Sequence, residues 1–180
     1  MTQEEIVISL VRILGALPVL RWPFAGAVLA ILVDLSDLFL MNLLHLGGVR
    51  NYQAMDKWLD LAYMVTFLIV ALRWSGLARN IACALFAYRI LGVVIFEIVG
   101  SRELLLFFPN VFEFWFVGIA AMKQFRPQFQ PDLRWSALAL APMLALKEFQ
   151  EYALHWAQWL DRYRAVDLVK DWWRWLTGWI

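Results

Sequence analysis

The sequence lacks several features on which common functions depend. It has one cysteine in 180 residues, Cys83, which excludes an intrachain disulfide. Its net charge is only +1, so no bulk attraction to nucleic acid is expected. It contains no internal repeat, no glycine-rich nucleotide loop, no recognisable serine nucleophile and no pair of haem ligands. Its first residues, MTQEEIV, lack the basic segment of a cleaved signal peptide, so we expect the first helix to be retained.

Apolar residues dominate what is present. They make up 63% of the chain, which also holds 11 Trp. A soluble domain is about half apolar, and Trp is enriched where a membrane meets water. The composition therefore predicts a multi-pass protein of the plasma (inner) membrane. We expect membrane lipids as its partners, no nucleic acid, and a homodimer as one possible assembly.

Six segments are long and apolar enough to be membrane spans, each of about 20 residues. The sequence therefore predicts an all-α bundle of six transmembrane helices over residues 1–158. Residues 159–180 mix charges with Trp and predict an interfacial amphipathic helix, although they could also continue the sixth span into water. The expected spans are 5–20, 23–45, 57–73, 78–99, 103–122 and 135–158.

Four aspartates interrupt this apolar pattern in two pairs. Asp34 and Asp37 end the second span, and Asp56 and Asp60 begin the third. Positions i and i+3, or i and i+4, share one face of a helix. The connection between the two spans is short, so the pairs should meet at one membrane face. A carboxylate in hydrocarbon is costly, and such residues mark functional sites.

Four carboxylates this close repel one another and would take up protons unless they are compensated. A hard divalent cation, Mg²⁺, Mn²⁺ or Ca²⁺, supplies that compensation through oxygen ligands. We therefore expect a metal site formed by the four aspartates. The alternative is a set of hydrated boundary carboxylates paired with Arg50 and Lys57.

The aspartate pattern resembles that of the CDP-alcohol phosphotransferases. That family carries D-x2-D-G-x2-A-R-x8-G-x3-D-x3-D across its second and third transmembrane helices. Here Asp34-x2-Asp37 is separated from Asp56-x3-Asp60 by eighteen residues, one more than in the family. The family also often has an Arg in its short first helix and another early in its fourth span, where this chain has Arg12 and Arg89. The resemblance covers about residues 8–100 and fades in the last two spans.

The nucleotide-reading positions depart from the family pattern. Leu38 and Tyr52 stand where the family has glycines, and Met41-Asn42 replaces its Ala-Arg. In the family, the glycines let the cytidine nucleotide approach and the Arg helps to hold its phosphates. The resemblance therefore implies a retained metal site with an altered or lost donor.

The resemblance also implies roles for individual residues. Asp34, Asp37 and Asp56 would be the main metal ligands, and Asp60 would be both a ligand and the general base for an acceptor hydroxyl. Arg89 could hold a substrate phosphate through its guanidinium. It could equally pair with Glu97 or Glu113 inside the bundle. Pro109-Asn110 could interrupt the fifth span.

Two functions are consistent with the sequence. The first is a metal-dependent phosphotransferase of phospholipid biosynthesis. The second is a non-enzymatic membrane protein whose acidic cluster binds or conducts a divalent cation. Basic loop residues favour an extracytoplasmic position for the aspartates, but the basic tail lies on the aspartate side, so orientation stays open.

Overall fold

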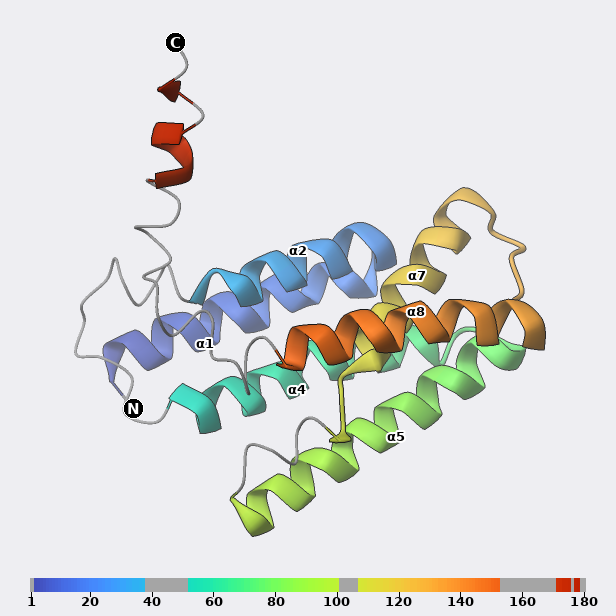
Figure 1. The fold of residues 1–180 in the computed structure, drawn as a ribbon, viewed down its shortest axis with the longest axis horizontal. Helices are drawn as coiled ribbons and strands as arrows, with labels where there is room; N and C mark the ends of the chain where they lie inside the picture. The colour runs from blue at the N-terminus through green and yellow to red at the C-terminus, as the bar shows by residue number, and fades with distance from the viewer. Residues whose placement is uncertain (1, 38–51, 101–106, 153–170, 176, 179–180) are drawn as a thin grey trace.

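The residues that the structure describes are mostly helical (Figure 1). This computed structural model describes residues 2–37, 52–100, 107–152, 171–175 and 177–178. Within these ranges there is no strand, which confirms the predicted all-α class. The main elements are α1 (Gln3–Ala16), the 3-10 helix η1 (Leu17–Leu20), α2 (Pro23–Leu35), α4 (Tyr52–Ala71), α5 (Gly76–Val99), α7 (Val111–Phe125) and α8 (Leu133–Glu151).

Local signals in the sequence set several helix ends. Thr2 and Glu5 cap α1 reciprocally: Thr2 Oγ1 accepts the Glu5 N–H at 3.2 Å, and the Glu5 carboxylate accepts the Thr2 N–H at 2.8 Å. Gly100 ends α5 in the left-handed conformation, with φ 73°. Asp132 begins α8 by accepting the Trp135 N–H at 2.7 Å. These caps satisfy backbone groups that would otherwise lack partners at the helix ends.

The observed helices match the expected spans closely at most boundaries. The fifth differs in part, since a break over residues 108–110 precedes α7, which begins at Val111. Pro109 and Asn110 are not helical, as expected for a break at this dipeptide. The end of the second expected span, the start of the fifth and most of the tail lie outside the described residues.

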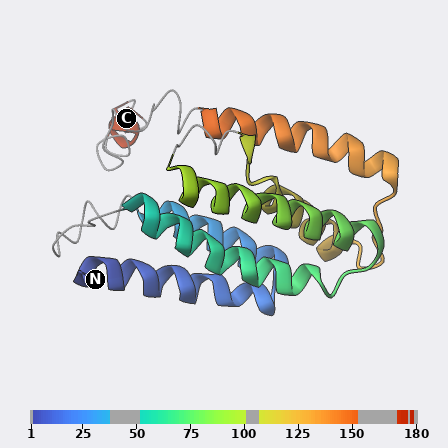
Figure 2. The same ribbon diagram turned by 90° about the horizontal axis from the view of Figure 1, so that it is seen from below.

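Helix α7 lies at the centre of the bundle. It contacts α2, α4, α5 and α8, while α1 and α2 form an antiparallel hairpin through η1 beside α4. Figure 2 shows α1 and α4 side by side, with α5 next to α4 and α8 along the far side. Because α7 is surrounded, seven of its 15 residues are buried, including Phe112, Trp115 and Phe116.

The interior is divided into an aromatic half and a polar half. In the aromatic half, Phe116 stacks on Phe67 with ring centroids 4.2 Å apart and on Trp74 at 5.1 Å. Trp115 Nε1 donates to the Ala78 carbonyl at 3.1 Å. The polar half lies where α1 and α4 begin and where α2 and α8 end (Figure 1). Its buried charged and polar residues include Glu4, Arg12, Asp37, Lys57, Arg89, Asn110, Glu113 and Lys147.

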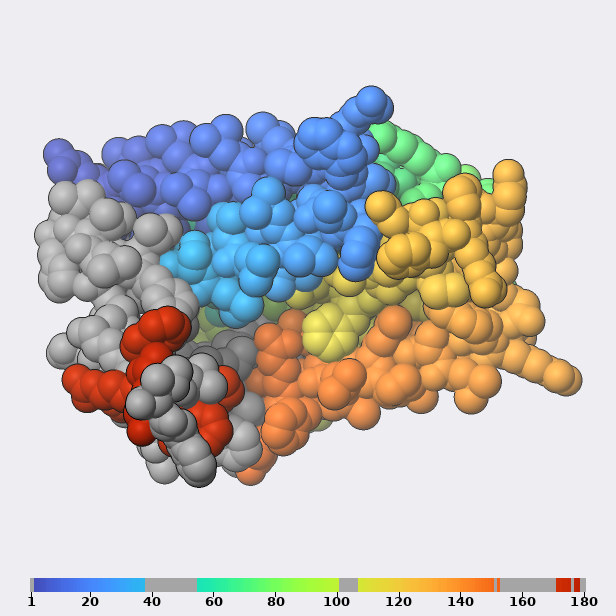
Figure 3. Space-filling model, turned by 90° about the horizontal axis from the view of Figure 1, so that it is seen from above, coloured from blue at the N-terminus to red at the C-terminus, as the bar shows by residue number. Residues whose placement is uncertain are grey.

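The outer surface carries large apolar side chains on five helices. Figure 3 shows one face of the molecule, on which α1 and α2 (blue) lie beside α7 and α8 (yellow and orange). Exposed apolar side chains on this many helices, beside several buried charged groups, are unusual for a soluble protein. The exposed apolar residues include Leu10 and Leu14 of α1, Leu32 of α2, Trp58 and Val65 of α4, Leu91 and Ile98 of α5, and Leu138 and Leu146 of α8.

One described helix, α5, is long and apolar enough to cross a membrane by length and composition. The core helix of a soluble protein can pass the same test, but such a helix is mostly buried. In α5 only 17% of the most apolar window is buried inside the protein. Helix α2 is apolar but shorter.

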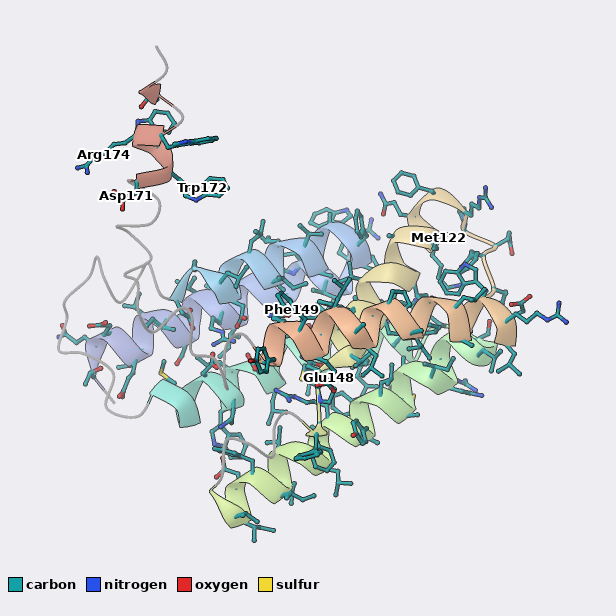
Figure 4. The ribbon with its side chains drawn as sticks, viewed as in Figure 1. Met122, Glu148, Phe149, Asp171, Trp172 and Arg174 are labelled. Carbon is teal, nitrogen blue, oxygen red and sulfur yellow. The ribbon has the colours of Figure 1, made fainter. Side chains whose placement is uncertain are left out.

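Three exposed tryptophans mark the short C-terminal helical segment. Trp172, Trp173 and Trp175 are each at least 65% exposed. Figure 4 shows Trp172 and Arg174 projecting to opposite sides of this segment. Arg174 lies 3.6 Å from Asp171, a fully hydrated pair that contributes little to stability.

The α1–α2 hairpin depends on a close backbone approach at Gly26. A Cβ atom at this position would lie 2.4 Å from the backbone nitrogen of Val19 and 2.5 Å from the carbonyl carbon of Pro18. Backbone atoms cannot rotate away as a side chain can. Only glycine therefore allows α2 to lie against η1 as it does.

Replacing Gly26 with Ala should destabilise the protein by about 2 kcal/mol or more, because the hairpin must open. The measurement is the unfolding temperature in detergent. Gly118→Ala is the matched control, since its Cβ would meet only the flexible end of Met143. Equal unfolding temperatures for Gly26→Ala and wild type would contradict the close approach.

Candidate metal centre

All four aspartates converge on one guanidinium. The Nη1 atom of Arg12 lies 2.9 Å from Asp37 Oδ2 and 2.8 Å from Asp56 Oδ1. Its Nη2 atom lies 2.6 Å from Asp60 Oδ1 and also contacts Asp34 Oδ1. We call Arg12 and these four residues the arginine–aspartate centre. The two pairs that the sequence predicted to meet do so, around a cation supplied by a third helix.

Helix geometry explains the convergence. Arg12 lies in α1, Asp34 in the last turn of α2, and Asp56 and Asp60 one turn apart near the start of α4. Asp37 follows α2 directly. Near Arg12, a Cβ atom at Gly15 would lie 2.9 Å from both methyl groups of Val33. The missing side chain at Gly15 thus lets α1 approach α2 next to the centre.

The centre is largely shielded from water. The Arg12 side chain is 2% exposed and that of Asp37 is fully buried, whereas those of Asp34 and Asp56 are about one third exposed. One side of the centre is therefore open. Four ionised carboxylates around one guanidinium leave an excess of three negative charges. Burial makes such an excess costly, so further compensation is favoured.

The donor set fits a hard divalent cation. Asp34, Asp56 and Asp60 each offer a carboxylate oxygen, and these three oxygens lie within 4.8 Å of one another. Ligand distances of about 2.0–2.6 Å for Mg²⁺ and Ca²⁺ allow two ligands of one ion to be up to about 4–5 Å apart. A buried oxygen, Asp37 Oδ1, has no hydrogen-bond partner within the described structure. Both observations fit an oxygen-ligated cation.

A second polar group lies deeper in the bundle, one turn along α4 from Asp60. Asn110 Nδ2 donates to both Tyr63 Oη and Glu113 Oε2 at 3.2 Å, and Tyr63 Oη donates to Glu113 Oε2 at 3.2 Å. Lys147 Nζ lies 3.5 Å from the same Glu113 oxygen. These four residues come from α4, from α7 and the residue before it, and from α8, and we call them the Glu113 cluster.

Arg89 is buried without an ion pair among the described residues. Its Nη1 donates to the Phe108 carbonyl at 2.8 Å, and its Nε has no partner. Glu97 is exposed, and Glu113 pairs with Lys147, so neither of the two expected partners holds Arg89. Arg89 and Glu113 both lie close enough to Asp60 to act on its carboxylate electrostatically.

The structure covers some of the sequence-based candidates and not others. Asp34, Asp37, Asp56 and Asp60 are together, with Arg89 near Asp60. Leu38, Met41, Asn42 and Arg50 lie outside the described residues, and Tyr52 only marks the start of α4. Lys57, the other expected partner of the aspartates, holds its Nζ 2.9 Å from the centre of the Phe96 ring.

Sequence reasoning missed the partner that the aspartates have. The family resemblance points to Arg12 but gives it no role at the aspartates. A usable signal existed, since a lone Arg within an apolar helix needs a buried counter-ion. Tyr63 and Asn110 carried no comparable signal, because neither is charged and their spacing is unremarkable.

Comparison with known proteins identifies no relative. No protein-family model, no curated protein and no solved structure matches the chain.

The Glu113–Lys147 pair yields a test of the Glu113 cluster. Glu113→Gln keeps the size and most hydrogen bonds but leaves a buried ammonium unpaired, which should cost about 3 kcal/mol. The double change Glu113→Gln with Lys147→Met should recover much of that loss. The unfolding temperatures of the two variants in detergent measure the loss and its recovery. The exposed Asp171→Asn serves as a control with no expected change. An unfolding temperature of Glu113→Gln equal to that of wild type would mean that the pair is hydrated.

Proposed function

We propose that this chain is a polytopic membrane enzyme that uses a divalent cation to transfer a phosphoryl or phosphatidyl group on a membrane lipid. It would be a divergent CDP-alcohol phosphotransferase with an altered donor site. The observation that carries the proposal is the convergence of Asp34, Asp37, Asp56 and Asp60 at one end of a helical bundle.

The distribution of side chains supports insertion in a bilayer with several spans. Several charged residues are buried beside the aromatic core, and large apolar residues are exposed on five helices. Lipid favours an apolar exterior and requires that buried charges be paired. An apolar surface of this extent would drive a water-soluble protein to associate. The exposed Trp172, Trp173 and Trp175 suit the boundary between lipid and water.

The four carboxylates would divide the chemical work. Asp34, Asp37 and Asp56 would hold Mg²⁺ or Mn²⁺, and Ca²⁺ fits the same oxygen donors. When bound, a divalent cation neutralises phosphate oxygens and orients them for displacement at phosphorus. Asp60 would accept the proton of the acceptor hydroxyl, whose oxygen forms the new bond to phosphorus while the nucleotide monophosphate leaves. The Asp60 side chain is 19% exposed, which leaves it reachable.

Arg89 supports a phosphate-binding role near Asp60. A buried guanidinium normally has a carboxylate or phosphate partner, because an unpaired buried charge is costly. Among the described residues Arg89 has a single hydrogen bond, to the Phe108 carbonyl. Its Nε and remaining Nη protons can therefore bind phosphate oxygens in the forked geometry that arginine favours.

A turnover assay tests the catalytic proposal. Purified protein in detergent with Mn²⁺ should release CMP from CDP-diacylglycerol or another CDP-linked donor when an acceptor alcohol is present. Asp60→Asn removes the base but keeps the side-chain size, so turnover should fall by about 10²-fold or more. Glu97→Gln is the matched control, because Glu97 is an exposed carboxylate on α5. Equal turnover by Asp60→Asn and wild type would exclude the base role.

Metal removal tests the site without requiring a substrate. EDTA should lower the unfolding temperature and Mn²⁺ should restore it, since a ligand that binds only the folded state stabilises it. Asp56→Asn should weaken this response, whereas Asp171→Asn should leave it intact. An unchanged unfolding curve across a wide range of Mn²⁺ would contradict a metal site.

A second function has an observation in its favour. Leu38 and Tyr52 stand where the resembled family has glycines, which suits a non-enzymatic protein that binds or conducts a divalent cation. A Mn²⁺-dependent unfolding temperature without CMP release from any donor, with several acceptors, would favour this alternative.

A further inference from the structure

We propose that Arg12 is a tethered cation that competes with a divalent metal for the four aspartates, and so sets the metal affinity of the centre. This inference rests on the proposed function, because it assumes that the aspartates bind metal. It goes further by giving α1 a role in deciding when they do so.

The first support is the position of the guanidinium. Arg12 contacts each of Asp34, Asp56 and Asp60, whose oxygens lie within 4.8 Å of one another. A metal shared by these three would lie about 2.0–2.6 Å from each oxygen. It would thus occupy the same shell of oxygens as the guanidinium. Two cations there would repel strongly, so binding of the metal requires Arg12 to withdraw.

The second support is that Arg12 leaves some buried polar atoms of the centre without a hydrogen-bond partner. The buried atom Asp37 Oδ1 has no hydrogen-bond partner, although the other oxygen of this carboxylate contacts Arg12. The Nε atom of Arg12 is also buried and unpartnered. One positive charge serves four carboxylates, whereas a divalent cation brings two. Arg12 is therefore a partial substitute, which a metal can displace when its concentration is high enough.

The arrangement differs from an ordinary structural ion pair. In an ordinary pair, one guanidinium binds one carboxylate through two parallel hydrogen bonds. Here one guanidinium is shared among four carboxylates from two other segments, and two of these carboxylates are partly exposed. The exposed side gives a metal a route to the carboxylates while Arg12 is still in place.

Competition has a measurable consequence for the wild-type protein. Part of the free energy of metal binding is used to displace Arg12, so the apparent Kd is higher than the four carboxylates alone would give. Without Arg12 the carboxylates repel one another, and folding itself should become dependent on metal.

The test compares wild type with Arg12→Gln by two measurements. Free Mn²⁺ is followed by electron paramagnetic resonance during a titration, and the unfolding temperature is recorded at each Mn²⁺ concentration. Arg12→Gln should bind Mn²⁺ with a Kd at least about tenfold lower than wild type. Its unfolding temperature should fall below that of wild type in EDTA and rise more steeply with Mn²⁺. Arg79→Gln, an exposed site on α5, is the matched control with no expected change.

The outcomes separate this inference from the proposed function. If neither wild type nor Arg12→Gln binds Mn²⁺, the metal site and the inference are both wrong. If both bind Mn²⁺ with the same Kd, the metal site stands and Arg12 is only structural.

If Arg12→Gln does not fold at any Mn²⁺ concentration, a second variant tests the same inference. The double variant Arg12→Gln/Asp37→Asn removes one charge of each sign and is compared with Asp37→Asn alone. Competition predicts a Kd for Mn²⁺ at least about tenfold lower in the double variant. Equal Kd values would overturn the inference.

Discussion

The sharing of one guanidinium among four carboxylates is the constraint around which the polar half of the bundle is organised. Arg12 draws α1 to the end of α2 and to the start of α4, because each of its contacts comes from one of those segments. Removing any one partner would change the charge of the whole group. The hairpin at Gly26 and the close approach at Gly15 allow the three segments to meet without a gap.

Much of the fold follows from the sequence because apolar length and turn chemistry are local properties. Each of the six described long helices lies within or near an expected span, and the break at Pro109-Asn110 is where the missing proline N–H predicts it. The meeting of the two aspartate pairs also follows locally, from i to i+3 and i to i+4 spacing together with a short connection.

The contacts of Arg12 could not be predicted in the same way. They depend on how α1 is rotated against α2 and α4, and that rotation is set by packing at Gly15 and Gly26 rather than by any periodicity near the aspartates. The Glu113 cluster has the same origin, since Tyr63 of α4, Asn110 before α7 and Lys147 of α8 share no common spacing. Sequence patterns identify charged residues that need partners. They do not say which partner each will find.

The central place of α7 has a consequence for the order in which the protein assembles. Every residue of the arginine–aspartate centre precedes residue 61, so the centre can form while α7 has yet to leave the ribosome. The Glu113 cluster cannot, because its Asn110 and Glu113 arrive with α7 and its Lys147 arrives last with α8. Synthesis from the N-terminus thus completes the two polar groups in succession. The early one needs only the first 60 residues, and the late one joins α7 and α8 to α4.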